Sequence, residues 1–98
     1  MEIKINIRNE AGEFAENKDT ARRLRTGTIL PALRGGGTVE FDFAGVRGAT
    51  QSFVHALVAE ALRRHGDHAM DSLFYKNCNA AIKEIIKTVY EYMQESLD

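Results

Sequence analysis

The sequence is poor in cysteine and in long apolar runs, and both shortages limit where the protein can work. Cys78 is the single cysteine, so no disulfide can form within one chain, and a reducing compartment is the simpler expectation. No apolar run approaches the roughly 20 residues that a membrane-spanning helix needs. Residues 2–8 alternate apolar and polar side chains and lack the apolar core of a signal peptide. We therefore expect a cytoplasmic protein without a membrane partner.

An excess of charge of either sign is also missing. The chain has 13 Lys and Arg residues against 14 Asp and Glu residues, a formal net charge of −1. This balance gives no electrostatic reason to bind nucleic acid or an anionic membrane surface. The basic groups Arg22, Arg23 and Arg25, and the pair Arg63 and Arg64, lack the interleaved aromatic residues of a nucleic-acid surface. We interpret both groups as solvated helix faces and expect no nucleic-acid partner.

Recognisable catalytic and cofactor motifs are absent as well. The glycines at 35–37 precede a predicted strand, and no Gly-Lys-Ser or Gly-Lys-Thr follows them, so they do not form a phosphate-binding loop. His65 and His68 could hold a metal weakly, but no third ligand stands at a suitable spacing. Cys78 has no neighbouring histidine or second cysteine that would activate its thiol. The sequence therefore predicts no metal, no cofactor and no enzyme activity.

The centre of the chain, residues 39–62, predicts a strand, a tight turn and a buried helix. Val39, Phe41 and Phe43 fall at every second position, which is the period of a strand. Residues 44–49 contain two glycines and indicate a turn. The apolar residues that follow recur at helical spacing and form one wide stripe, made of Phe53, Val54, Leu57, Val58, Ala61 and Leu62.

Similar patterns on either side complete a single predicted domain over residues 1–98. The remaining elements, in chain order, are a strand at 2–8, a loop at 9–18, a helix at about 20–34, a buried strand at 72–76 and a helix at about 80–96. Pro31 lacks a backbone N–H, so we expect a kink or break in its helix near residues 27–31. The β-α-β-α-β-α order implies an α/β domain with a mainly parallel sheet packed by helices.

Several local details follow from single residues. The charged face of strand 2–8 predicts a position at the edge of the sheet. Asn17 or Asp19 can cap the helix that follows, and Asn79 can cap the last helix. We expect Phe14 to anchor its loop on the core and residues 65–68 to form a solvated turn.

The last helix carries more apolar residues than its core-facing stripe requires. The stripe itself repeats at helical spacing and consists of Ile82, Ile86, Val89, Met93 and Leu97. Ile85 and Tyr92 lie beside the stripe and leave apolar surface that a second copy of the chain could cover. We predict a weak homodimer through this helix.

The central stretch also carries a family resemblance. Phe-Asp-Phe-Ala-Gly-Val at 41–46, followed by Ala-Thr-Gln-Ser-Phe at 49–53, resembles the signature of a family of small STAS-like domains of unknown function. These are similar to the STAS domains of bacterial anti-anti-sigma factors. In that family a kinase partner phosphorylates a Ser or Thr in the first turn of the helix, and phosphorylation controls binding. An Asp usually precedes this Ser, whereas Gln51 stands at that place here.

The resemblance implies a regulatory protein-interaction module without enzyme activity. The expected partner is a kinase-like ATPase of the type that switches anti-anti-sigma factors, docked on the loop and helix start at residues 44–55. The phosphoacceptor candidates are Ser52 and Thr50, and the exposed contacts to the partner would be Arg47, Gln51, Ser52 and His55. From the residues alone, Thr50 is a helix cap and Ser52 belongs to the first helical turn.

Two alternatives of other classes remain open from the sequence. One is a small enzyme or ligand-binding domain that uses Asp42 and the loop at 44–50, which would need a pocket with converging polar groups. The other is a structural assembly subunit that dimerises through the last helix. A simpler role for Asp42 is structural: it can accept hydrogen bonds from the N–H groups of the turn at 44–46, which contains Gly45.

Overall fold

The computed structural model describes the backbone of residues 1–97 and the side chains of residues 1–95. Its elements, in chain order, are β1 (Glu2–Asn6), α1 (Ile7–Ala11), β2 (Phe14–Ala15), α2 (Lys18–Leu24), the π-helical turn η1 (Arg25–Ile29), α3 (Leu30–Arg34), β3 (Thr38–Asp42), β4 (Gly48–Ala49), α4 (Gln51–His65), α5 (Asp67–Ser72), β5 (Leu73–Lys76) and α6 (Ala80–Leu97). The six predicted elements are all present, and four short ones are added between them.

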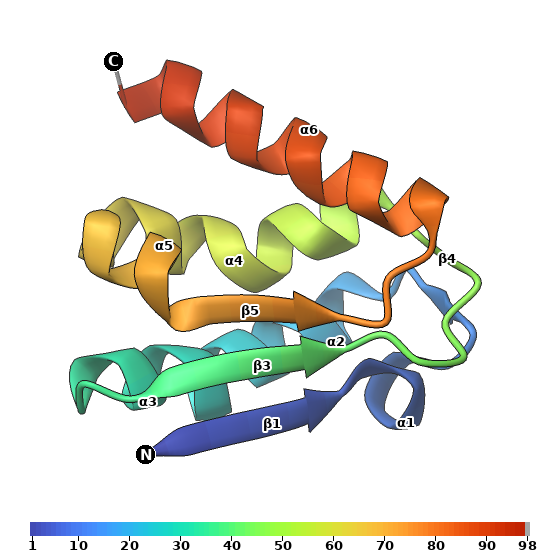
Figure 1. Ribbon diagram of the computed structural model, residues 1–98, viewed down its shortest axis with the longest axis horizontal. Coiled ribbons are helices and arrows are strands. Elements are labelled where there is room, and N and C mark those ends of the chain that lie inside the picture. Colours follow the sequence, from blue (N-terminus) through green and yellow to red (C-terminus); the bar gives the residue numbers. More distant parts are fainter. Residues whose placement is uncertain (98) are drawn as a thin grey trace.

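Three parallel strands form the main sheet, in the order β1-β3-β5 (Figure 1). The central strand β3 pairs with β1 so that Ile5 lies opposite Phe41, and with β5 so that Phe41 lies opposite Tyr75. The edge position predicted for the first strand is confirmed. The short strands β2 and β4 form a separate parallel pair. The α/β class and the parallel sheet are therefore as the element order predicted.

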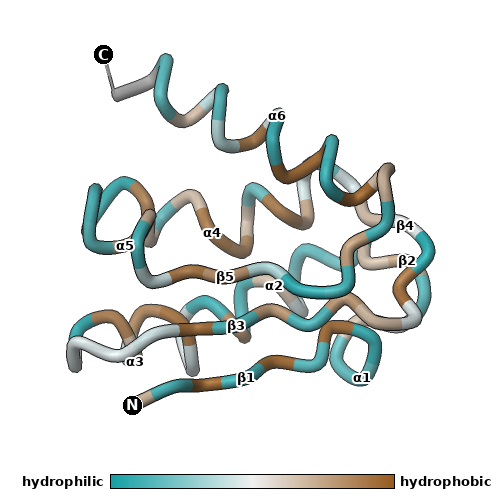
Figure 2. The backbone as a smooth tube through the Cα atoms, in the orientation of Figure 1, coloured by the Kyte–Doolittle hydropathy of each residue, from teal (hydrophilic) through white to brown (hydrophobic). Residues whose placement is uncertain are grey.

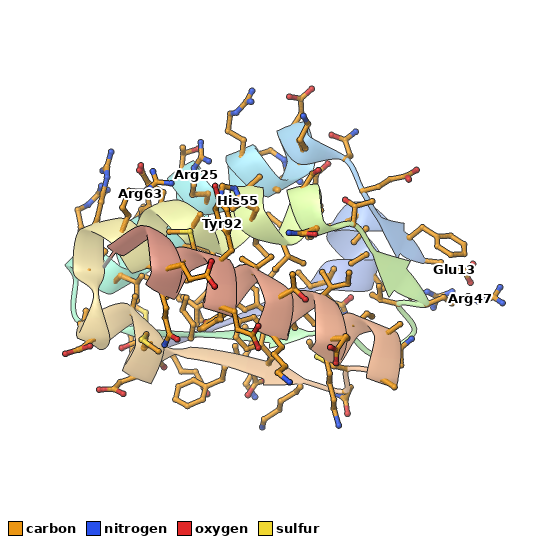
Figure 3. All side chains as sticks on the ribbon, turned by 90° about the horizontal axis from the view of Figure 1, so that it is seen from above. Glu13, Arg25, Arg47, His55, Arg63 and Tyr92 are labelled. Atoms are coloured by element: carbon orange, nitrogen blue, oxygen red, sulfur yellow. The ribbon has the colours of Figure 1, made fainter. Side chains whose placement is uncertain are left out.

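Helices cover one face of the sheet, and the other face is open to solvent (Figures 1 and 3). The period of two decides which residues face the helices: Val39, Phe41 and Leu73 are at most 5% exposed. Their neighbours on the open face include Lys4, Lys76 and Glu40, of which the first two are exposed. Figure 2 shows this alternation of hydrophilic and hydrophobic residues along β1 and β3.

The core lies between the sheet and the helices and is centred on α4. Phe53, Leu57 and Val58 of this helix have no exposed surface, so the predicted stripe is confirmed. The helix α6 packs over α4 with Ile82, Val89 and Met93 buried. The Leu97 side chain, the last member of the predicted stripe, lies outside the described residues. None of the helices described for residues 1–97 is long and apolar enough to cross a membrane.

The first strand and the loop after it differ from the prediction. The strand ends at Asn6, and a short helix follows because the Asn6 side chain accepts a hydrogen bond from the Asn9 N–H at 2.9 Å. Ile7, predicted as a strand residue, is buried in that helix. Phe14 belongs to β2 and is 59% exposed, so it does not anchor the loop on the core as expected.

The helix predicted at 20–34 is interrupted, as Pro31 indicated. The interruption is the π-helical turn η1, in which the Leu30 N–H donates to the Arg25 carbonyl. Pro31 stands just after this turn, at the start of α3, and has no N–H to donate to a carbonyl of the preceding helical turn. Asn17 is the residue that caps α2, and its side chain accepts from the N–H groups of Asp19 and Thr20.

The segment after α4 also needs correction. Residues 65–68 do not form a simple turn, because α4 runs to His65 and α5 begins at Asp67, with Gly66 between them at φ +52°. Ser72, expected in the third strand, ends α5. Phe74, expected to be buried, is 47% exposed because it points to the open face of the sheet.

Candidate docking site at the start of helix α4

A tight turn connects β3 to the loop that leads into α4. The Val46 N–H donates to the Phe43 carbonyl at 3.0 Å, which closes a four-residue turn. Gly45, the third residue of this turn, has φ +78°, a value that suits glycine. A Cβ at Gly45 would also lie 2.7 Å from the Arg8 Cδ atom. Glycine at position 45 is therefore favoured by the backbone conformation, whereas the clash would only displace the flexible, exposed Arg8 side chain.

Asp42 fixes this turn to the end of β5. Its Oδ1 atom accepts hydrogen bonds from the Ala44 N–H and from the Asn77 side-chain amide, both at 2.9 Å. These two hydrogen bonds, the one from Asn77 first, hold the pKa of the Asp42 carboxyl below its usual value. The predicted hydrogen bond from the turn to Asp42 is thus confirmed. The second donor, Asn77, could not be predicted from the sequence; its backbone has φ +59°.

The loop from Val46 to Thr50 is held by backbone contacts to the β2 segment. The Arg47 N–H donates to the Glu13 carbonyl at 2.7 Å, and the Thr50 N–H donates to the Ala15 carbonyl at 3.0 Å. The Asn79 side chain donates to the Arg47 carbonyl at 2.9 Å, so the start of α6 supports the same loop. The exposed Arg47 guanidinium lies 5.8 Å from the centre of the Phe14 ring, a cation–π distance.

Two hydroxyl residues begin α4 in different environments. The Thr50 hydroxyl accepts a hydrogen bond from the Phe53 N–H at 3.1 Å, so Thr50 is the helix cap. Ser52 lies in the first turn with its side chain exposed. Gln51, between them, is also exposed. Both phosphoacceptor candidates are exposed, but the Thr50 hydroxyl is engaged with the backbone as the helix cap, whereas Ser52 is not the cap.

Ser52 lies in an open groove between α2, α4 and α6. The groove has a volume of about 460 Å³ and is lined by Lys18, Gln51, Ser52, His55, Ala56 and Tyr92. The rings of His55 and Tyr92 meet edge to face with their centres 5.8 Å apart (Figure 3). His55 is therefore half-buried against α6 and is not the fully exposed contact that we expected.

The comparison with known families agrees with this arrangement of strand, turn and capped helix. A family model described as a STAS-like domain of unknown function (DUF4325) matches residues 20–83, from α2 to the first turn of α6. The chain belongs to this family. No curated protein and no solved structure gives a significant match.

In this STAS-like domain the predicted contact residues form two groups. Gln51, Ser52 and His55 line the groove, whereas Arg47 lies with Phe14 at the β2–β4 end of the molecule (Figure 3). Lys18 and Tyr92 also line the groove, but sequence reasoning did not assign them to the site. Nothing in the pattern around Lys18 signals this position. The helical pattern marks Tyr92 only as an apolar residue beside the stripe of the last helix.

Other reactive side chains of the STAS-like domain lie apart from the groove. The rings of His65 and His68 are 6.0 Å apart, and the described residues contain no group of three or more His, Cys, Asp or Glu that could hold a metal. Partial burial raises the pKa of the Cys78 thiol, which disfavours the nucleophilic thiolate. The Asp42 carboxylate accepts hydrogen bonds from the Ala44 N–H of the turn and from the Asn77 side chain after β5.

Proposed function

We propose that this STAS-like domain is a non-enzymatic regulatory module that binds a protein partner through residues 44–55. The proposed partner is a kinase-like ATPase of the type that switches the anti-anti-sigma factors, which the sequence resembles. Ser52 is the proposed phosphoacceptor. The observation that carries the proposal is the contrast at the helix start, where Thr50 is engaged as the cap and Ser52 is exposed in a groove.

Ser52 lies where a phosphate could change partner binding without unfolding the domain. A phosphate adds about −1.5 to −2 charges, and the first turn of a helix tolerates an anion because free N–H groups and the helix dipole favour it. Lys18 lines the same groove and supplies a cation near the site. The domain can therefore accept the phosphate, whereas a partner surface matched to a neutral hydroxyl would have to desolvate the added charge.

Both groups of predicted contact residues offer side chains that commonly anchor protein interfaces. Tyr92 is 54% exposed and Phe14 is 59% exposed, and Arg47 lies over the Phe14 ring. Tyrosine and arginine are enriched among the residues that dominate binding energy. We propose that Tyr92 with His55 forms one anchor of the docking surface and that Arg47 with Phe14 forms the other.

The proposal is tested by the affinity of the partner for charge variants at Ser52. A partner is first isolated from the native cell, and its affinity is then measured by calorimetry. Ser52→Asp should weaken binding about a hundredfold, which corresponds to about 2.7 kcal/mol, and Ser52→Ala should leave it within about threefold of the wild type. Gln94→Glu is the matched control, because it adds one negative charge at an exposed position of α6 outside the groove. Equal affinities of the Asp and Ala variants would refute the switch.

A further inference from the structure

The free edge of β5 is a second surface of this domain, separate from the groove at Ser52. The strand β5 lies at the end of the sheet order β1-β3-β5, and among the described residues it pairs with β3 alone. The Phe43 N–H donates to the Lys76 carbonyl, so the backbone groups of Lys76 point towards β3. Because successive residues of a strand point their backbone groups to opposite sides, the N–H and C=O of Tyr75 point away from the sheet.

A groove runs beside this edge, between β5 and α6. It has a volume of about 580 Å³, and its lining includes Tyr75 from the strand and Ile86 from the helix. Ile86 is half-buried and gives the groove an apolar floor. An extended chain laid along β5 would pair with the Tyr75 backbone and place alternate side chains towards Ile86. This combination of a strand edge and an adjacent helix suits peptide binding by strand addition.

The charge of the groove selects among the chains that could fill it. Its lining contains three lysines, Lys76, Lys83 and Lys87, and no Asp or Glu. Lys76 is paired with Glu40 on the open face at 3.0 Å, and the exposed Lys87 approaches Glu91 only to 4.0 Å. Lys83 forms no ion pair with the described residues. A second copy of this chain, paired edge to edge, would bring two such lysine groups together and is disfavoured by their repulsion.

We propose that the edge of β5 binds an extended, acidic peptide segment of a partner protein, which adds a strand to the sheet and places carboxylates near Lys83 and Lys87. The inference does not rest on Ser52 or on the partner proposed above. Binding at β5 is therefore expected to be the same for the wild type and for Ser52→Asp, so that either proposal can fail without the other.

The probe is a pool of capped octapeptides with glutamate at every second position and mixed apolar residues between. Nuclear magnetic resonance should show shifts of the Tyr75 and Asn77 amides when the pool is added, and the Tyr75 N–H should exchange more slowly with solvent. Lys83→Glu combined with Lys87→Glu should weaken binding at least about tenfold. Arg34→Glu with Arg63→Glu is the matched control, because it makes the same charge change at two exposed positions outside this groove.

Backbone methylation of the probe tests the strand pairing itself. Alternate residues of an extended peptide point their N–H groups to opposite edges, so methylation of one alternate set should abolish binding and methylation of the other should not. Three results would overturn the proposal: no amide shifts at millimolar peptide, equal binding of both methylated pools, or binding unchanged by the lysine reversals. Protection of the Tyr75 N–H without peptide, together with a doubled mass, would assign the edge to a second copy and would overturn it as well.

Discussion

At the scale of single residues, the two hydroxyls at the start of α4 should differ in their effect on stability. Thr50→Ala removes the acceptor of the Phe53 N–H and should lower the free energy of unfolding by about 1 kcal/mol, within a range of roughly 0.5–2. Ser52→Ala removes an exposed hydroxyl and should change it by less than about 0.5 kcal/mol. Urea unfolding of both variants measures the difference. A larger loss for Ser52→Ala than for Thr50→Ala would show that the cap is misassigned.

Asp42 should make the free energy of unfolding of the domain depend on pH in the acidic range. Its pKa is lowered in the folded chain, mainly by the Asn77 hydrogen bond, so the folded state holds this proton less tightly than the unfolded state. The resulting stabilisation is present above about pH 4, the ordinary range of an Asp carboxyl, and is lost as the pH falls through the lower folded value. Unfolding of the wild type should therefore become easier with acidification over this interval.

The variant Asp42→Asn isolates that contribution. Its side-chain oxygen can still accept from the Ala44 N–H but does not titrate, so its unfolding free energy should fall less steeply with acid than that of the wild type. Asp19→Asn is a suitable control because Asp19 is exposed and belongs to a different element. Parallel pH profiles for the wild type and Asp42→Asn, measured by denaturation between about pH 2 and 6, would contradict the assignment.

Residue-scale predictions succeeded where the deciding contact is local in sequence. Thr50 and Asn79 cap their helices by accepting from an N–H three residues ahead, and such contacts can be read from residue type and spacing. The predictions for Phe14 and His55 failed because their surroundings come from elsewhere in the chain. Phe14 lies against Arg47 of the loop before β4, and His55 against Tyr92 of α6. No local pattern contains that information.

At the scale of elements, α4 should be the main source of stability. Phe53 has no exposed surface, so Phe53→Ala should lower the free energy of unfolding by about 3–5 kcal/mol, through lost burial and the cavity left behind. That is a large part of the roughly 5–15 kcal/mol typical of a small domain. Arg63→Ala, at an exposed position of the same helix, should cost less than about 0.5 kcal/mol. Similar unfolding midpoints for the two variants would mean that the buried face of α4 is misplaced.

Element prediction worked for segments long enough to show a period and failed for shorter ones. The strands β1 and β3 and the helices α4 and α6 each show their alternation or stripe in the sequence, whereas β5 was predicted only as a short buried run. The strands β2 and β4 have two residues each and exist because they pair with each other. The interruption near Pro31 was predictable from the missing N–H, but its form, a π-helical turn, depends on how α2 and α3 pack.

At the scale of the whole molecule, the open face of the sheet is the feature that sequence reasoning missed. A parallel sheet is usually covered by helices on both faces. A charged side chain on either face would then be buried and would need a partner. Here the strands alternate, with the open face polar, and Glu40 is 7% exposed beside Lys76 at 3.0 Å. The helices α2, α3 and α4 lie on the one covered face, and α6 packs over α4 rather than on the open face.

The exposed apolar residues of α6 predict that the domain self-associates weakly. Tyr92 is 54% exposed, and Ile85 beside it is half-buried, so α6 presents a small apolar surface to solvent. An interface of this size should support only a weak dimer, with an average mass that rises with concentration in the high micromolar range. Sedimentation equilibrium measures this mass. Tyr92→Lys should keep the chain monomeric, whereas Phe74→Ser, which removes an exposed aromatic ring from the open sheet face, should leave the association unchanged.

The same surface connects self-association to partner binding. Tyr92 lines the groove that contains Ser52, so a second copy covering Tyr92 would obstruct the proposed docking surface. Dimer and partner complex should therefore exclude each other, and addition of partner should shift the domain from dimer to a complex with one copy of each chain. A constant monomer mass at all concentrations would remove the dimer. A complex that retains two copies of the domain would show that the dimer surface lies elsewhere than at Tyr92.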